Sequence, residues 1–367
     1  MSHQALTYYR YSPEVEVKQP EEDELIERIV ASMSRVNSKA FDQYRHATRD
    51  AHAKSHGILV GHLEVYDNLP EHLAQGLFAK PARYPVVIRL SSAFGHIKDD
   101  RIPTAYGMAV KVIGVEGEKI LPEHQAELTQ DFLMVNFPVI PFGHVQAYWK
   151  MQNMAEKYDE TPDLIKQIGE SLAKPISSVA GLLAHQKSPL KKIGAPPTHI
   201  LGQTFYSMAA IRYGDYIAKI SAAPLSTEVQ ALAGESVDIS DRPSGMRDLV
   251  VDFFSRFGAE YELRAQLCTN PADMPIEDAS IEWDEAKSAY QPIGKIVLSP
   301  QAAYSPARRV YADDVLSFNP WHCLKAHQPL GSINRVRKPA YARSSSFRHE
   351  MNVQPRIEPR DISEVPD

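Results

Sequence analysis

The sequence predicts an α+β fold in which helices and a wrapping loop surround an antiparallel β-barrel. Three observations support this prediction. Short runs rich in Val and Ile, with a period of two, occur in the first half of the chain and again in the second. A long segment of helical composition separates the two groups of strands. The order of strands, helices and strands is typical of α+β proteins, whereas a parallel sheet would alternate strand and helix throughout.

The chain begins with an arm and a helix. Residues 1–20 show no regular pattern and are predicted to be irregular. Residues 21–37 place Leu25, Ile29 and Met33 at helical spacing, which predicts an amphipathic helix. Four acidic residues stand at its start, where negative charge interacts favourably with the helix dipole. The predicted division of the chain is an N-terminal arm and helix at residues 1–40, a barrel domain at 41–352 and a loosely ordered tail at 353–367.

Six stretches are predicted to contain strands. In the first of them, Leu59 and Leu63 alternate with Ile58 and Val60, so the two pairs face opposite sides of a sheet. The six stretches are residues 57–66, 85–91, 107–115, 131–141, 203–221 and 261–268.

The remaining segments are predicted to be helices and loops. Residues 144–187 contain few strand formers and are predicted to be helical, and residues 188–202 are basic and rich in proline, which indicates a loop. Residues 291–335 are predicted to form a proline-rich wrapping segment. A final helix is expected near residues 340–350.

The composition excludes several classes of protein. Hydrophobic residues are 43% and charged residues 23% of the 367, as in ordinary globular proteins, and the net charge of −6 argues against a nucleic-acid partner. No apolar run is long enough to span a membrane, and the first residues hold no apolar stretch of signal-peptide length. Cys268 and Cys323 are too few for a disulfide framework and are predicted to be buried thiols. The expected location is the cytoplasm.

Two widely separated residues suggest redox chemistry. Tyr341 lies four residues after Arg337, and His52 lies almost three hundred residues upstream. A tyrosine phenolate can hold a haem iron from one side while a histidine acts on peroxide from the other. A free phenol has a pKa of about 10, and an arginine charge beside it favours the phenolate. The pair therefore predicts a ferric haem site.

The residues around this pair resemble those of the haem catalases. Five motifs stand in the order that they have in that family, and the resemblance covers residues from about 40 to 350. The motifs are the segment that starts at His52 and runs into a strand, Arg89-Leu-Ser91 after a Val-rich run, Tyr106-Gly-Met-Ala-Val-Lys-Val112, Asp131-Phe-Leu-Met-Val-Asn136-Phe-Pro138, and Arg337-x-x-x-Tyr341 followed by Arg348.

The resemblance implies three residues that act on the substrate. His52 matches the distal histidine, which transfers a proton between the two peroxide oxygens, a task suited to histidine near neutral pH. Asn136 matches the distal amide, which orients the peroxide by hydrogen bonding without adding charge. Ser91 matches the serine that hydrogen-bonds the histidine and fixes its tautomer.

The resemblance also implies the cofactor, haem b, and the residues that hold it. Tyr341 matches the axial ligand of the iron, and Arg337 matches the arginine beside it. Pro339 lies between them and is favoured only in the first turn of a helix, so a helix that begins there would leave Arg337 outside it. Three further arginines match residues that meet the haem propionates, because a guanidinium fork suits a carboxylate. They are Arg49, Arg89 and Arg348.

The chain is short for a catalase and looks more like the compact catalase-related peroxidases and fatty-acid hydroperoxide enzymes. Ala51, before the distal histidine, leaves more room above the iron than the valine or threonine of other branches. The implied function is a haem peroxidase that cleaves the O–O bond of hydrogen peroxide or an organic hydroperoxide through a ferryl intermediate. It would use a small reducing donor and form a homo-oligomer, with a dimer favoured.

Other functions remain open at this stage. Within the same class, the alternatives are a fatty-acid hydroperoxide dehydrase or isomerase similar to allene oxide synthase, and a true catalase. In other classes, they are a non-catalytic haem-binding protein and a haem-free barrel that binds a lipid. A zinc site at His52 and His56 is disfavoured, because no Glu or Cys completes it. The glycines form no dinucleotide-binding fingerprint, and no serine lies in a nucleophile elbow.

Overall fold

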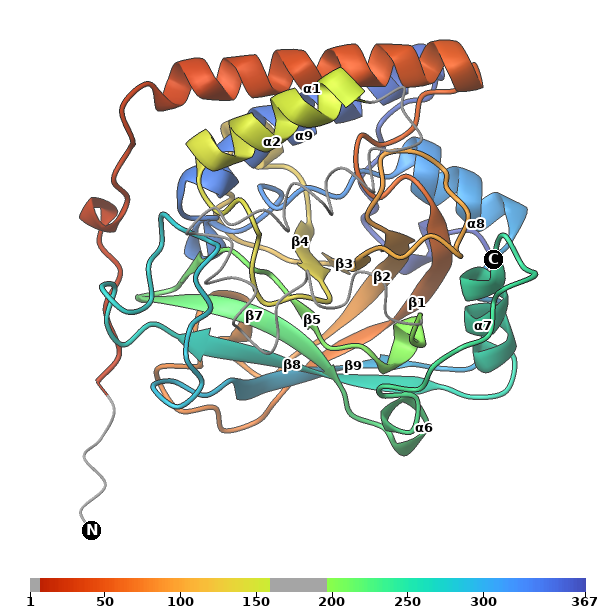
Figure 1. The fold of residues 1–367 in the computed structure, drawn as a ribbon. Coiled ribbons are helices and arrows are strands. Elements are labelled where there is room, and N and C mark those ends of the chain that lie inside the picture. The colour runs from red at the N-terminus through yellow and green to blue at the C-terminus, as the bar shows by residue number, and fades with distance from the viewer. Residues whose placement is uncertain (1–6, 159–196) are drawn as a thin grey trace.

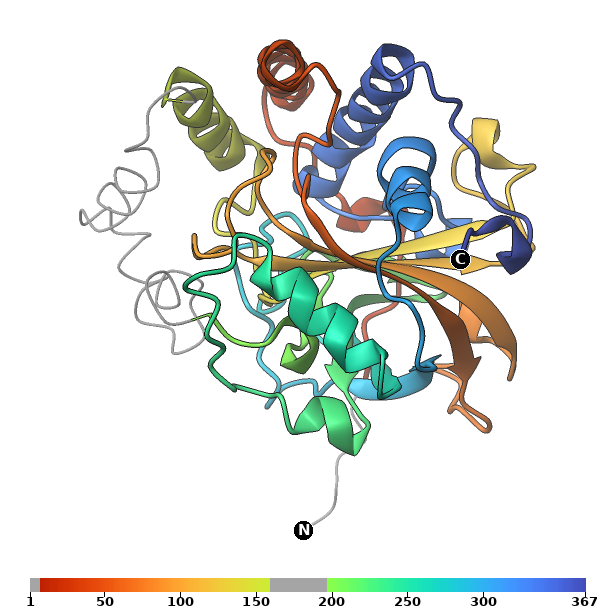
Figure 2. The ribbon, with the colours of Figure 1, turned by 90° about the vertical axis from the view of Figure 1, so that its right-hand side faces the viewer.

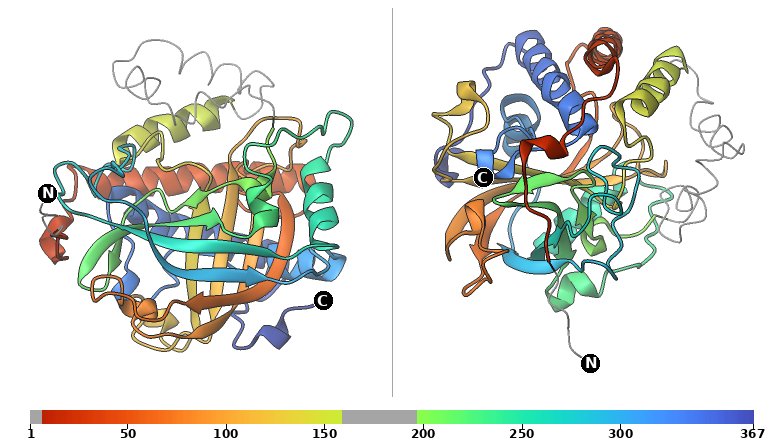
Figure 3. Two further views of the ribbon diagram at one scale, coloured as in Figure 1. Left: turned by 90° about the horizontal axis from the view of Figure 1, so that it is seen from below. Right: turned by 90° about the vertical axis from the view of Figure 1, so that its left-hand side faces the viewer.

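A computed structural model describes residues 7–158 and 197–367 of the chain. Its nine described strands form one sheet in the order β5-β4-β3-β2-β1-β9-β8-β7-β6, and every pairing is antiparallel. Because β5 also pairs with β7, eight of these strands close into a barrel, and β6 extends from β7 as a hairpin (Figures 1 and 3). The strands are β1 Ser55–Val65, β2 Arg83–Ser92, β3 Tyr106–Ile113, β4 Thr129–Val135, β5 Phe205–Tyr206, β6 Ile211–Tyr213, β7 Tyr216–Pro224, β8 Ala259–Leu267 and β9 Gln291–Leu298.

The predicted α+β class and antiparallel barrel are confirmed, but the prediction missed β9. Its residues were assigned to the wrapping segment, because Pro292 and Gly294 are both unfavourable inside a strand. In the structure Pro292 pairs with Arg264 beside an irregularity in the β8–β9 register. A proline at such a position removes no regular ladder hydrogen bond. β9 therefore joins β1 to β8 and completes the barrel.

Side chains alternate between the inside and the outside of the barrel. Ile88 and Leu90 of β2 belong to the apolar core inside, as do Met108 and Val110 of β3. The residues between them, such as Arg89, consequently lie on the outer face. This alternation places polar side chains of β2 next to the helices that cover the barrel.

Three helices cover one side of the barrel: α1 Glu22–Tyr44, α2 Val145–Tyr158 and α9 Ser332–Met351 (Figures 1 and 2). An apolar cluster joins them, with Ile29 from α1, Val145 from α2 and Val336 from α9. The predicted helix at 144–187 corresponds to α2 as far as Tyr158, and the rest lies outside the described residues. The other described helices are α6 Thr227–Gln230, the unpredicted α7 Gly245–Phe254, and α8 Pro306–Val310, which runs into a π-helical turn at Tyr311–Val315. No described helix has the length and apolarity needed to cross a bilayer.

Helix α9 starts eight residues earlier than the first residue of the predicted helix. It follows Gly331, whose φ of 85° suits glycine, and the amide of Ser332 donates to a carboxylate oxygen of Glu277 at 2.8 Å. Pro339 therefore lies inside the helix, where its missing N–H leaves the carbonyl of Arg335 without a helical partner. Ion pairs with other segments of the chain stabilise the first turns of α9. Arg335 makes ion pairs with Glu277, with Glu16 of the arm and with Glu22 of α1.

The tail at 353–367 is anchored, in contrast to the predicted loose order. Glu358 forms an ion pair with Lys111 on β3 at 2.6 Å, and neither side chain is more than 6% exposed. Val365 packs into a small apolar cluster on the outside of the barrel, and the carbonyl of Asp367 accepts from Ser305 at 2.7 Å. Buried lysine and glutamate are tolerated together because each neutralises the other. The composition of the tail could not predict the ion pair between Glu358 and Lys111.

Candidate functional site

A cavity of about 1080 Å³ lies between the outer faces of β2, β3 and β4 and the three covering helices. Its size lies slightly above the ~300–1,000 Å³ that small-molecule sites occupy. Apolar side chains make up most of its wall, including Phe137 and Phe142. All eight residues singled out from the sequence line it: Arg49, His52, Arg89, Ser91, Asn136, Arg337, Tyr341 and Arg348.

His52 is held in one orientation by its neighbours. Its backbone has a φ of 58°, in the left-handed region that few residues other than glycine adopt. Its Nδ1 lies 3.0 Å from the hydroxyl oxygen of Ser91, a hydrogen bond between the loop before β1 and the end of β2. The ring also lies against Gly107 of β3, where a Cβ atom would come within 2.6 Å of Nδ1 and Cε1. Nε2 is therefore the ring nitrogen left for the cavity.

The environment keeps the His52 ring neutral. Burial lowers its pKa from the usual 6.5 to about 3, and the positive charges of Arg89, Arg337 and Arg49 contribute in the same direction. A neutral imidazole with Nδ1 engaged can accept a proton at Nε2. At neutral pH the His52 ring is therefore unprotonated, with the Nε2 lone pair available.

Asn136 follows the end of β4 and is 8% exposed. Its side-chain oxygen accepts from the backbone amide of Tyr106 at 2.9 Å. Its Nδ2 donates to the side-chain oxygen of Gln203 at 3.3 Å, which leaves the second N–H of the amide unused by that bond. The amide group is thus fixed in orientation by two partners while keeping a donor for a ligand.

Tyr341 and Arg337 lie one helical turn apart on α9. Arg337 donates to the phenol oxygen at 3.3 Å, and its guanidinium carbon lies 5.2 Å from the ring centre. The buried Asn334 accepts from the other end of the guanidinium at 3.1 Å and so orients it. The i, i+4 contact therefore forms despite Pro339, because the helix extends through that residue.

The three other arginines converge on the turn at 312–316. Arg49 donates to the backbone carbonyls of Ala312 and Leu316 at 2.7 and 2.9 Å. Arg89 binds the carboxylate of Asp313 at 2.9 Å, and Arg348 binds the carbonyl of the same residue at 2.9 Å. The Nε of Arg348 is buried, and no described residue accepts a hydrogen bond from it.

Three buried guanidinium groups repel one another at this end of the cavity. Burial lowers the pKa of Arg348 to about 10, and repulsion by Arg89 contributes. Burial likewise lowers the pKa of Arg49, together with repulsion by Arg348 and Arg89. Burial would raise the pKa of Asp313, but Arg89 and Arg49 outweigh it and lower the pKa. Three guanidinium groups thus surround the carboxylate of Asp313, with Asp314 and Asp50 also acting on Arg348, and a ligand with carboxylate groups would find several donors here.

Sequence reasoning missed several residues of the site. Asp313 lies in a π-helical turn of the proline-rich segment, where no periodicity marks it. Gly107 is part of a matched motif, but its contact with His52 depends on the β2–β3 register. Asp50 lines the cavity and accepts from Ser344 at 2.8 Å, and burial raises its pKa. Only its position two residues before His52 could have drawn attention to it.

We expect the free energy of unfolding to fall steeply on acidification. Burial lowers the pKa of His52 and His56 to about 3, and that of His199 and His327 to about 4. An unfolded histidine has a pKa of ~6.5, so between pH ~6.5 and ~3 the unfolded state binds more protons than the folded state. Each drop in pH across this range therefore lowers the free energy of unfolding. Melting temperatures measured from pH 7.5 to 4.5 should therefore decrease throughout that range.

Two variants test whether protonation of buried histidines, and not of other acidic or basic groups, causes the loss of stability at low pH. His327→Gln keeps an acceptor for the amide of Leu77, which His327 Nε2 holds at 2.9 Å, and should make the pH dependence shallower. His72→Gln changes a half-buried histidine, whose Nε2 lies 3.3 Å from the Gln291 side chain, and serves as the comparison. Equal slopes in the two variants would contradict the explanation.

Comparison with solved structures identifies the fold. No protein-family model and no curated protein sequence matches the chain. Among solved structures, a fungal catalase matches with a TM-score of 0.61 at 15% identity, over 85% of this chain and 61% of the catalase. Catalase A from Saccharomyces cerevisiae matches with 0.57 at 14% identity, over 96% and 70%, and a bacterial catalase with 0.57 at 13%, over 96% and 66%. The chain therefore has the fold of the catalases and spans about three fifths of the length of the fungal one.

Proposed function

We propose that this protein is a haem enzyme that reduces peroxides. The observation that carries the proposal is the gathering of Tyr341 with Arg337, of His52 with Ser91, and of three arginines around one cavity. The donor set fits haem: a phenol oxygen can ligate ferric iron, and two propionates suit the three guanidinium groups. The Nε of Arg348 provides a further buried donor for such a carboxylate.

In this proposal Tyr341 holds the iron, Arg337 supports the negative charge on its oxygen, and Arg49, Arg89 and Arg348 hold the propionates. Bound haem supplies the electrons that break the O–O bond. His52 Nε2 accepts the proton of one peroxide oxygen and returns it to the other. Ser91 accepts from the Nδ1–H of His52, which keeps Nε2 the basic nitrogen. The free N–H of Asn136 orients the peroxide, and the apolar wall limits competing water.

The wall also bears on the substrate. A cavity of about 1080 Å³ with mostly apolar lining has space for an organic group beside the cofactor. It favours an organic hydroperoxide, reduced at the expense of a small donor, over hydrogen peroxide alone. The same observation supports a second candidate, a hydroperoxide dehydrase or isomerase, in which the organic group itself is rearranged. A homo-oligomeric state and a cytoplasmic location stay predictions.

A spectrum and a substrate panel test this proposal. Protein purified from haem-replete cells should show a Soret band, and pyridine haemochrome analysis should give one haem b per chain. Steady-state rates are then compared for hydrogen peroxide, cumene hydroperoxide and a fatty-acid hydroperoxide, with and without a reducing donor. A peroxidase needs the donor, a catalase releases oxygen from hydrogen peroxide, and a dehydrase converts the fatty-acid substrate without a donor. Absence of haem would end the proposal.

The packing of His52 gives a graded prediction. Ser91→Ala removes one hydrogen bond worth ~0.5–1.5 kcal/mol, so peroxide turnover should fall by about tenfold or less. Gly107→Ala places a Cβ 2.6 Å from the His52 ring and must displace it, so turnover should fall further than in Ser91→Ala.

The ratio of haem to protein serves as the control for both variants, and it should stay at the wild-type value. Gly114→Ala is a matched glycine change, because no atom lies within 4 Å of the added Cβ although the backbone φ is positive. We expect it to lose some stability, because the positive φ strains an alanine, but to keep the wild-type rate per haem. Unchanged turnover in Gly107→Ala would show that the ring position is not important.

A further inference from the structure

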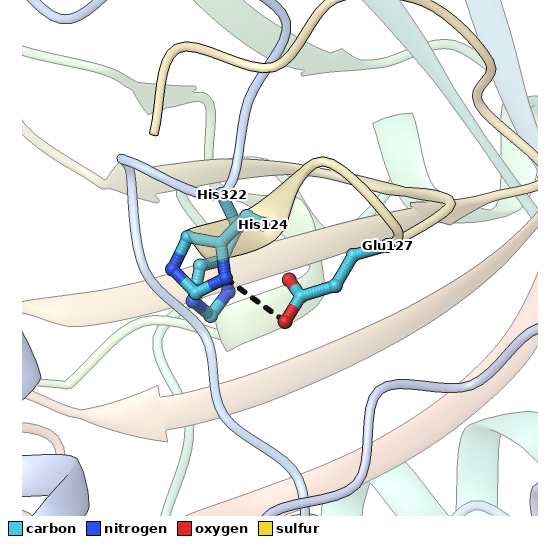
Figure 4. Close-up of side chains that lie close together, drawn as sticks. All are labelled: His124, Glu127 and His322. Atoms are coloured by element: carbon cyan, nitrogen blue, oxygen red, sulfur yellow. Dashed lines mark ion pairs between the residues drawn. The ribbon is translucent and has the colours of Figure 1, made fainter. Parts of the chain in front are cut away.

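A second group of ligand-type side chains lies away from the cavity. His124, Glu127 and His322 each offer one atom to a common point, and these atoms lie within 4.8 Å of one another (Figure 4). None of the three lines the cavity. Two of them come from the connection between β3 and β4, and the third comes from the segment before α9.

The backbone fixes the positions of these residues. His124 ends a short 3-10 turn, and its carbonyl accepts from the amide of Glu127 at 3.0 Å. The carbonyl of His322 accepts from the amide of Asp131 on β4 at 2.8 Å. The two segments are therefore joined to the same strand, and the ligand atoms meet without any change of the main chain.

The tautomer of His322 follows from its two neighbours. Its Nε2 lies 3.1 Å from a guanidinium nitrogen of Arg356, and a guanidinium group can only donate. Nε2 therefore carries the lone pair, and the Nδ1–H donates to Asp131 at 3.2 Å. A histidine that donates one N–H to a carboxylate and presents its other nitrogen is the usual arrangement at metal centres.

His124 and Glu127 show the complementary feature. The Nδ1 of His124 lies 2.9 Å from a carboxylate oxygen of Glu127, yet this buried nitrogen makes no hydrogen bond of acceptable geometry with any described residue. The two atoms face each other closely, as drawn by the dashed line in Figure 4. A cation that both can ligate would satisfy them together.

Arg356 now supplies positive charge at this point. Its two terminal nitrogens lie 2.8 and 3.1 Å from the Glu127 oxygens, and its side chain is 29% exposed. It belongs to the C-terminal tail and also forms an ion pair with Glu358 at 3.1 Å. A metal ion would therefore have to displace it, and the two cations should compete for Glu127 and His322.

We propose that His124, Glu127 and His322 bind a divalent first-row transition ion, with zinc the expected one, in competition with Arg356. Two imidazoles and one carboxylate are typical ligands of zinc, whereas magnesium and calcium prefer oxygen ligands throughout. Tetrahedral bonds of ~2.1 Å place ligands ~3.4 Å apart, so modest side-chain rotation closes the present separations. A fourth position remains for water or a substrate.

Equilibrium dialysis against zinc, with the zinc content measured by mass spectrometry, tests this proposal on the full-length protein. We expect one zinc ion per chain. His124→Ala should raise the dissociation constant by more than ~10-fold, since it removes a direct ligand. Arg356→Gln should lower it by about tenfold, because the competing cation is gone. His62→Ala is the matched control, since His62 pairs with Glu64 at 2.9 Å and no third ligand among the described residues completes that pair.

Circular dichroism and thermal melting establish that each variant is folded. The result for Arg356→Gln distinguishes a metal site from a polar network. If Arg356 competes with zinc, its replacement tightens zinc binding. If Arg356 only supports the fold, its replacement does not. Absence of stoichiometric zinc in the wild-type protein would overturn the proposal. So would equal affinities of the wild-type protein and His124→Ala, or weaker binding by Arg356→Gln. These readouts do not depend on whether the cavity binds haem.

Discussion

Replacement of Tyr341 by phenylalanine is expected to remove haem from the purified protein while the chain stays folded. Phenylalanine keeps the ring, and only the oxygen that accepts from Arg337 at 3.3 Å is lost. Loss of an outer partner of a metal ligand costs ~10–100-fold in metal affinity, and loss of the ligand itself should cost at least as much. The measurement is the Soret absorbance relative to protein, with circular dichroism to confirm the fold.

Tyr148→Phe is the control for this experiment. Tyr148 lines the same cavity from α2, and burial raises the pKa of its phenol, as does the charge of Asp50. Its hydroxyl therefore stays protonated and is a poor ligand for iron. Tyr148→Phe should keep its haem. Equal haem contents in the two variants would contradict the assignment of Tyr341.

Replacement of His52 by alanine is expected to lower peroxide turnover by ~10²–10⁴-fold, the usual contribution of a positioned acid or base. Haem content should be unchanged, because the role proposed for His52 is to act on the peroxide and not to hold the cofactor. Stopped-flow measurement of the first reaction with peroxide reports this step directly. Since the pKa of His52 is lowered to about 3, the wild-type rate should show no inflection from this residue between pH 5 and 8.

Added imidazole gives a further test of His52. The alanine variant leaves a space beside Ser91 and Gly107 that a free imidazole can occupy, so imidazole should restore part of the rate. His72→Ala changes a histidine outside the cavity and should keep full activity. If His52→Ala turned over peroxide at the wild-type rate, the acid–base role would be wrong.

Much of the fold could be predicted because its strands keep a clear period of two. Leu59 and Leu63 lie in the core inside the barrel and Ile58 packs outside, as their alternation predicts. β9 could not be predicted, since its proline is accommodated by an irregularity that depends on its partner strand. The start of α9 was missed for a related reason. Its first amide is capped by Glu277, a residue far away in the sequence.

The site shows the same division between local and distant information. His52, Arg89 and Tyr341 stand in recognisable motifs, and the structure brings them to one cavity. No motif indicated the residues that hold these side chains. Asp313 binds Arg89 from a π-helical turn, which has no sequence periodicity, and Gly107 contacts His52 only when β2 and β3 pair in register. Sequence motifs identify groups that carry chemistry, whereas the residues that orient them depend on tertiary packing.

The ion pairs of Arg335 have a practical consequence for anyone who shortens this chain. One guanidinium joins Glu16, Glu22 and Glu277, and its own helix carries Tyr341 six residues later. Trimming an expression clone to the barrel would remove two of these three tethers. The engineered fragment would then carry Tyr341, the proposed iron ligand, on a helix with a loosened beginning, so cofactor loading in truncated clones should be compared with that of the full-length protein.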